Sequence, residues 1–454
     1  MTPLRYRPIR DHYGLGDFAA MSIFLRATFW ILIILTCSAA VFCGYQIERP
    51  IAMVWPMETV AVWGAVAALF SAIGLFFTMP QSRNGRIGLV IGLVLVAFSA
   101  YTSFQALGRT KFLYRSVDLA VNIESPTGDV VTVGGVLVLP LNRYDLSVVL
   151  LMPDASPDSF ARNLFYAKAL ARRGIAAVAY RRSNPNAKSP NALAAVDLET
   201  RGEDVIFILD LLEKRTELNM RHAGVMGFGE NEWVIPYTAQ KTTRLYFATL
   251  IAPSGMTPTE RIIANLDQKL RAEGISSDEL ESAKALVSDL GQNLQTGDVG
   301  EQRAKLIVRW EAAKQKEWFK SAAFPDEVPQ LGGLTAAATS LAFAPEPLWA
   351  LVEVPVLLVA GSADSMSLPE TLRARFAKYF EKNEKATWDL QVVPNANHQM
   401  LVNAEDYGSL DADIPPGFFD SLAAWIGKVT APPEMTNSAG QESLPAHPAP
   451  MSAQ

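Results

Sequence analysis

The stretch "MGFGENEW", residues 226–233, joins an apolar run to a segment with helical character. Residues 223–226 suit a buried strand, residues 233–240 suit a helix, and Gly227 and Gly229 bracket a tight turn between them. Strand, glycine turn and helix are the setting in which a G-x-S-x-G motif presents a nucleophilic serine. The central position of the turn holds Gly229 here. The stretch therefore predicts a fold, and it leaves the chemistry of that fold in question.

Apolar strand patterns alternate with amphipathic helix patterns over residues 116–429. The expected strands are 130–139, 146–152, 175–180, 245–251, 354–361 and 388–394, and the expected helices are 159–173, 196–214, 369–379 and 415–426. Gly174 follows one of these helices at the position where a left-handed C-terminal cap is common. The alternation predicts a mostly parallel central sheet that is covered by helices on both faces.

The strand patterns stop between the two halves of this core. The core is divided into residues 116–254 and 346–429, and residues 255–345 form a predicted helical insert placed as a cap would be. Thr257 and Glu260 are spaced as a capping box with Pro258 at the first helical position. Ser276 and Glu279 repeat that spacing and predict a second capped helix.

Three apolar segments without a charged residue precede the core. They cover residues 27–45, 59–79 and 87–106, and each has the length of about 20 residues that crosses a bilayer. A cleaved signal peptide would account for the first segment alone, since the other two would still anchor the chain. We therefore expect residues 27–106 to form three transmembrane α-helices, preceded by a juxtamembrane segment, residues 1–26.

The distribution of basic residues gives a narrow preference for membrane orientation. Four arginines precede the first span (Arg5, Arg7, Arg10 and Arg26), and two lie between the second and third spans (Arg83 and Arg86). The loop between the first and second spans has one arginine, Arg49. Arg109, Lys111 and Arg115 follow the third span and oppose this preference. The expectation is an integral protein of the inner or plasma membrane with its globular domain on the periplasmic, extracytoplasmic side. The tail, residues 430–454, is expected to be disordered.

Three segments near the C-terminus carry a family resemblance. "VPVLLVAGSAD" (354–364), "VVPNANH" (392–398) and "PPGFFDSLAAWI" (415–426) resemble the α/β-hydrolase fold, in particular bacterial serine esterases and peptidase-like hydrolases with a helical insert. The resemblance covers roughly residues 118–428. It implies that Asp364 is the triad acid, that His398 is the triad base, and that Gly229 stands at the nucleophile position.

The chain departs from the family at three separate loops. A glycine at residue 229 offers no nucleophile, whereas acyl transfer in this fold requires a serine hydroxyl. The oxyanion region comprises Met152, Pro153 and Glu230; proline has no amide hydrogen to donate, and Asp154 adds negative charge. The run "YRRSNPNAKSP" (180–190) replaces the family's usual Tyr-Asp-x-Arg-Gly. These departures predict that catalysis has been lost while the frame remains.

Composition and charge argue against nucleic-acid binding and against a metal centre. The net charge of −6 gives no basic field for nucleic acid, and no cofactor is expected. Both cysteines lie in the first apolar segment and only four histidines occur, so a metal centre is not expected. The expected partners are the lipid bilayer, a membrane-protein partner or subunit, and a small ester or peptide ligand.

Two functional readings remain open from the sequence. The first is a membrane-anchored pseudoenzyme that acts by binding or as a scaffold of a membrane assembly. The alternative is an active ester or peptide hydrolase that uses Asp364 and His398 with an unrecognised nucleophile. Glu230, beside the missing serine, and Ser254, at the end of another strand, are the weaker candidates for that nucleophile.

Overall fold

A computed structural model describes most of the globular part of the chain. The described residues are 15–46, 114–124, 130–156, 158–183, 197–322, 324–329, 341–405, 407, 409 and 412–431, together with parts of 63–101. Residues 432–454 of the predicted tail and residues 1–14 of the predicted juxtamembrane segment lie outside them, whereas Thr430, placed in the tail by the sequence, is the last residue of the C-terminal helix.

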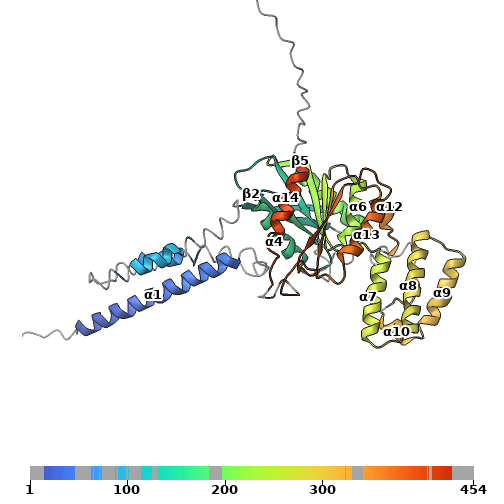
Figure 1. Cartoon of the computed structure of the whole chain (residues 1–454), viewed down its shortest axis with the longest axis horizontal. Helices are drawn as coiled ribbons and strands as arrows, with labels where there is room; N and C mark the ends of the chain where they lie inside the picture. Colours follow the sequence, from blue (N-terminus) through green and yellow to red (C-terminus); the bar gives the residue numbers. More distant parts are fainter. Residues whose placement is uncertain are drawn as a thin grey trace, which may run out of the picture.

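One eight-stranded sheet forms the centre of the globular domain (Figure 1). Its strand order is β1-β2-β4-β3-β5-β6-β7-β8. The strands are β1 (Tyr114–Glu124), β2 (Val130–Pro140), β3 (Leu146–Leu151), β4 (Ala176–Ser183), β5 (Leu218–Phe228), β6 (Phe247–Ile251), β7 (Val356–Gly361) and β8 (Trp388–Val393). The β1–β2 and β2–β4 pairs are antiparallel, and every later pair is parallel. Six parallel strands thus place their carboxyl ends along one edge of the sheet.

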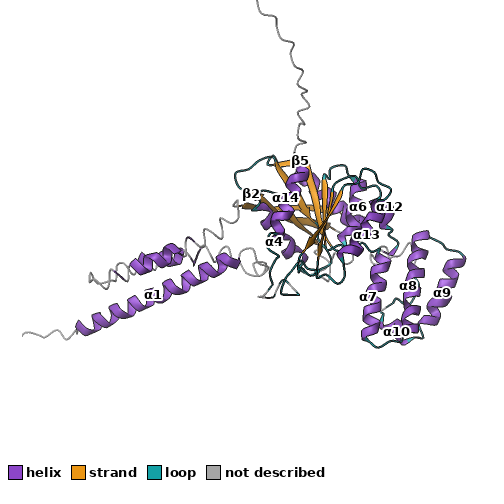
Figure 2. Ribbon diagram, viewed as in Figure 1, coloured by secondary structure: helices purple, strands orange, loops and turns teal. Residues whose placement is uncertain are grey.

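Helices cover both faces of the sheet, as the alternating pattern predicts (Figure 2). Successive side chains of a strand point to opposite faces of the sheet, so a central strand covered on both faces is apolar throughout. In β3, Val148 and Leu150 belong to one hydrophobic core, whereas Val149 and Leu151 belong to the other. The first core is closed by α5 (Leu198–Leu212), α6 (Asn231–Lys241), α12 (Pro345–Trp349) and α13 (Pro369–Phe380). The second is closed by α4 (Ser159–Ala171) and α14 (Phe418–Thr430). This mostly parallel sheet with flanking helices fits the α/β-hydrolase fold.

The insert forms a helical unit beside the sheet, with a core of its own. Its helices are α7 (Pro258–Ala272), α8 (Ser277–Thr296), α9 (Glu301–Ala313) and α10 (Glu317–Ser321). They pack around the fully buried Trp310, and they extend to one side of the sheet (Figure 1). The capping box of α7 is confirmed, because Thr257 accepts from the Glu260 amide and the Glu260 carboxylate accepts from the Thr257 amide.

One sequence expectation is wrong, and one strand of the structure was not expected from the sequence. The second capping box is wrong: the Ser276 hydroxyl donates to the Glu279 carboxylate at 3.2 Å, so it caps no backbone amide of α8. Strand β1 was not predicted, although its residues alternate between half-buried and exposed along most of its length. Its place at the sheet edge explains the weak signal, since one strand with one covered face buries few apolar side chains.

The first predicted span lies within α1 (Leu15–Gln46). Much of the second and third predicted spans, residues 59–79 and 87–106, lies outside the described residues. Within the part of the chain that is described, no helix is both long enough and apolar enough to cross a membrane.

Candidate functional site

The turn between β5 and α6 has the backbone shape of a nucleophile elbow. Gly229 has φ +46°, its amide donates to the Ile251 carbonyl at 2.9 Å, and α6 begins two residues later. Gly227 is required by close packing, because a Cβ there would lie 2.4 Å from the Cβ of Asn231. At Gly229, by contrast, the one atom of the described residues that would lie within 4 Å of an added Cβ is Nη2 of Arg261, at 3.9 Å. Residue 229 thus has room for a side chain that the sequence does not supply.

The acid and base that the resemblance implies are brought together. Nδ1 of His398 lies 2.9 Å from Oδ2 of Asp364, and Oδ1 accepts from the amides of Met366 and Ser367 at 2.8 and 3.1 Å. Burial by itself would raise the pKa of the Asp364 carboxyl. The hydrogen bond and charge of His398, with the two amide donors, outweigh burial and hold that pKa below its ordinary value. Asp364 therefore stays ionised and orients the histidine ring.

Gly361 allows the loops that carry Asp364 and His398 to approach each other. A Cβ at this residue would lie 2.2 Å from the carbonyl oxygen of Ala396. The same loops are joined by backbone hydrogen bonds from Ser362 to Val393 and from Ala363 to Ala396, both 2.9 Å long. The Asp364–His398 contact thus depends on a glycine three residues before the acid.

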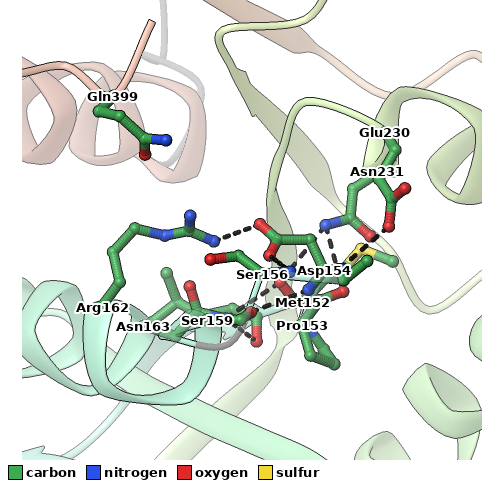
Figure 3. A network of polar contacts seen from close by, with 12 residues as sticks. Met152, Pro153, Asp154, Ser156, Ser159, Arg162, Asn163, Glu230, Asn231 and Gln399 are labelled. Atoms are coloured by element: carbon green, nitrogen blue, oxygen red, sulfur yellow. Dashed lines mark hydrogen bonds and ion pairs between the residues drawn. The ribbon is translucent and has the colours of Figure 1, made fainter. Parts of the chain in front are cut away.

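The loop after β3 is held by buried polar contacts (Figure 3). The amide of Met152 donates to Met226 at 2.8 Å, and the carbonyl of Pro153 accepts from Arg201 at 3.2 Å. Asp154 forms an ion pair with the buried Arg162. The negative charge that the sequence places at Asp154 is therefore compensated by the guanidinium of Arg162.

Glu230 folds back onto this loop. Its Oε1 accepts from Nη1 of Arg201 at 2.9 Å and from the amide of Ala155 at 3.2 Å. The Ala155 amide lies in the loop after β3, in a residue that lines the same pocket as Gly229, and a backbone amide there is a donor that an oxyanion would use. The chain's own carboxylate holds that donor, so Glu230 is a ligand of the oxyanion region and is not oriented as a nucleophile.

Ser254 is also committed elsewhere. Its hydroxyl donates to Oε1 of Glu232 at 2.5 Å, and Oε2 of the same carboxyl accepts from the Gly255 amide at 2.6 Å. Both side chains are buried, and neither lines the pocket that contains His398. Burial raises the pKa of Glu232 to about 7, against the hydrogen bonds from Ser254 and Gly255 and the charge of Arg261. Ser254 thus supports a loop and a buried carboxyl.

Glu232→Gln should remove a pH dependence of stability. The folded chain keeps a proton on Glu232 up to about pH 7, whereas the unfolded chain releases it near the ordinary value of 4.5. The unfolded state therefore binds fewer protons in this window, and the free energy of unfolding falls as pH rises from 4.5 to 7. The difference amounts to roughly 3 kcal/mol.

Urea unfolding of both proteins at pH 5 and pH 8 measures this effect. The wild-type chain should lose roughly 3 kcal/mol more than Glu232→Gln over that interval. The pH dependence contributed by Asp204, another buried carboxyl whose pKa burial raises to about 7, is the same in both proteins and cancels in the comparison. Equal losses in the two proteins would contradict the assignment to Glu232.

A pocket of about 180 Å³ lies between the turn at Gly229, the loop after β3 and the loop that carries His398. Its lining includes Gly229, His398 and Glu230 from the sequence-predicted set, and Asp364 lies behind His398. Met152 and Pro153 are buried and are not among the residues that line the pocket. Sequence reasoning missed the arginines of the site, whose positions had no motif to mark them: Arg162, Arg201 and Arg261.

The chain matches no family model and no curated protein. Among similar solved structures is a hypothetical protein from Pseudomonas aeruginosa, at 17% identity and TM-score 0.40, covering 70% of this chain and 94% of that one. A thermophilic esterase from Thermogutta terrifontis has 15% identity and TM-score 0.38, covering 69% and 99%. An alpha/beta hydrolase from a Penicillium species has 15% identity and TM-score 0.36, covering 63% and 91%.

Proposed function

We propose that this chain is a catalytically inactive protein of α/β-hydrolase fold that acts by binding a ligand or partner. The observation that carries the proposal is Gly229 at the elbow, lining the same pocket as His398. The histidine and its carboxylate are in place to accept a proton. The residue that would supply the proton and attack a carbonyl carbon has no side chain.

A second obstacle to acyl transfer is independent of the first. The tetrahedral intermediate needs amide donors for its oxyanion. Pro153 has no amide hydrogen, and the Ala155 amide already donates to Glu230 at 3.2 Å. The nucleophile is missing, and the Ala155 amide is already occupied by Glu230. Both observations favour a pocket that binds ligands without converting them.

The proposal predicts no ester or peptide turnover that depends on the retained pair. The purified full chain is assayed with p-nitrophenyl acetate, p-nitrophenyl butyrate and aminoacyl p-nitroanilides. Wild-type and His398→Ala proteins should give the same rate as buffer. Turnover that disappears in His398→Ala would contradict the proposal.

One observation favours the alternative of a working hydrolase. Ser156 is exposed and lines the same pocket as His398, so the pocket does contain a hydroxyl. A fluorophosphonate probe tests this candidate in the wild-type chain. A covalent adduct mapped to Ser156, absent from Ser156→Ala, would establish the working hydrolase and overturn the inactive one.

We also propose that the N-terminal apolar segments anchor the chain in a membrane as three helices. Small residues support this: Ala68 and Ala72 are buried against α1, and a Cβ at Gly64 would lie 3.2 Å from the Cβ of Ala40. Small residues inside and large apolar residues outside are typical of packed membrane helices. The exposed large side chains of α1 are Phe24, Ile31, Leu32, Ile34, Leu35 and Phe42. Release of the chain from membranes by alkaline carbonate would contradict this anchor.

Within this proposal the globular domain lies on the extracytoplasmic side of an inner or plasma membrane. Its partner is a membrane protein or complex that uses the domain as a binding subunit. Protease added outside intact spheroplasts should then cut the domain, and a stoichiometric partner should co-purify in mild detergent. Protection from the protease would place the domain in the cytoplasm instead.

A further inference from the structure

The pocket beside Gly229 contains a guanidinium that no described acidic side chain pairs with. Arg261 belongs to the first turns of α7 and lines the pocket. The other charged groups nearby are paired, Asp154 with Arg162 and Glu230 with Arg201. Nη1 of Arg261 is buried and lacks a hydrogen-bond partner among the described residues. Nη2 is the atom of this group that faces the space at residue 229, and no described acidic side chain pairs with it.

The absent side chain at residue 229 opens space in front of this guanidinium. A Cβ built at Gly229 would have Nη2 of Arg261 as its one described neighbour within 4 Å, at 3.9 Å. The volume that a nucleophile's hydroxyl would fill thus faces a cation. Because residue 229 is a glycine, the pocket has no reacting side chain at this position, and the guanidinium of Arg261 is accessible in its place.

A buried carboxyl that interacts with Arg261 does not neutralise it. The Glu232 carboxyl interacts electrostatically with Arg261, but it already accepts from Ser254 and Gly255. Burial raises its pKa to about 7, so much of it is protonated near neutrality. The guanidinium therefore keeps a charge and planar N–H donors that match a carboxylate.

The dimensions of the pocket limit the ligand. About 180 Å³ is close to an engineered cavity of about 150 Å³ in another protein that binds benzene. Phe228 and Ala252 give the lining an apolar part beside its polar groups. We infer that the pocket binds a small carboxylate with a short apolar body, its carboxylate paired with Arg261 in the space left by the missing serine. This inference rests on the proposed binding function.

Calorimetric titration of the full chain tests the ligand class. The probes are butyrate and benzoate, the matched neutral amides butyramide and benzamide, and inorganic phosphate. The two carboxylates should bind at least roughly ten-fold more tightly than their amides, because hydrogen bonds to a charged group are the stronger ones. Equal binding of acids and amides, tighter binding of phosphate, or no binding at millimolar concentration would each overturn the inference.

Substitutions assign the binding to Arg261. Arg261→Gln should weaken the carboxylates by roughly ten-fold to a hundred-fold and leave the amides unchanged, and Arg261→Lys should restore part of the loss. Arg271→Gln is the matched control, since Arg271 lies on the same helix and pairs with Asp267 at 2.6 Å, outside the pocket. Carboxylate affinity unchanged in Arg261→Gln would contradict the site.

The two proposals fail in different assays. Turnover that depends on His398 would contradict an inactive protein, and the charge preference of the pocket would still be measured by titration. Loss of that preference would contradict the carboxylate site and leave the absence of turnover intact.

Discussion

Gly229→Ser should give the protein a fluorophosphonate-reactive serine at residue 229, where the wild-type chain has none. The hydroxymethyl group fits, since the one described atom near a Cβ there is Nη2 of Arg261 at 3.9 Å. The base that must accept the hydroxyl proton is already oriented, with Nδ1 of His398 2.9 Å from Asp364. A side chain at φ +46° costs about 1–2 kcal/mol of stability, so the variant still folds.

Ester turnover by this variant should nevertheless remain slow. Glu230 keeps the Ala155 amide occupied, with Oε1 at 3.2 Å from the nitrogen. The double variant Gly229→Ser/Glu230→Ala frees that amide, and one oxyanion donor is worth about a hundred-fold or more in kcat. We expect the double variant to exceed Gly229→Ser by roughly that factor. Glu230→Ala alone has no nucleophile at the elbow and is the matched control.

Mass spectrometry of the labelled peptide and initial rates with p-nitrophenyl butyrate measure both effects. The adduct should map to residue 229 and should vanish when His398→Ala is added. Equal labelling with and without His398 would show that the pair does not act on the elbow. Equal rates for the single and double variants would remove Glu230 from the oxyanion region.

Gly361→Ala should destabilise the domain by about 3 kcal/mol or more, because it overpacks two backbone segments. The new Cβ would lie 2.2 Å from the carbonyl oxygen of Ala396 and 2.8 Å from that of Asn397. These atoms belong to the backbone just before His398, which cannot rotate away as a flexible side chain would. The loops must separate, and the hydrogen bond between His398 and Asp364 should lengthen or break.

Thermal unfolding and the fluorophosphonate reaction report the two consequences of Gly361→Ala. The melting temperature should fall by about 6 °C or more, and a Gly229→Ser/Gly361→Ala protein should label far more slowly than Gly229→Ser. Gly427→Ala is the control: no described atom lies within 4 Å of its Cβ, and alanine favours the interior of α14. A melting temperature for Gly361→Ala equal to that of Gly427→Ala would contradict the close approach.

The order of elements was readable from the sequence because it depends on local patterns. Buried parallel strands appear as short apolar runs and amphipathic helices have apolar faces at helical spacing, so β3, β4, β7 and α4 fall close to their predicted bounds. Gly229, Asp364 and His398 were assigned from the family resemblance, and the structure brings His398 and Asp364 into contact at 2.9 Å. The edge strand β1 was not predicted, because a strand at the edge of a sheet needs little apolar surface and its sequence pattern is weak.

The sequence alone determined that residue 229 offers no hydroxyl or carboxylate, because a glycine has no side chain in any conformation. Only the tertiary structure decided how the surrounding charges are used. Arg162 neutralises Asp154, Glu230 reaches an amide 75 residues upstream, and Arg261 arrives from the insert without a partner among the described residues. Such pairings depend on which distant elements converge and on how far burial removes each group from water, and neither property is encoded in neighbouring residues.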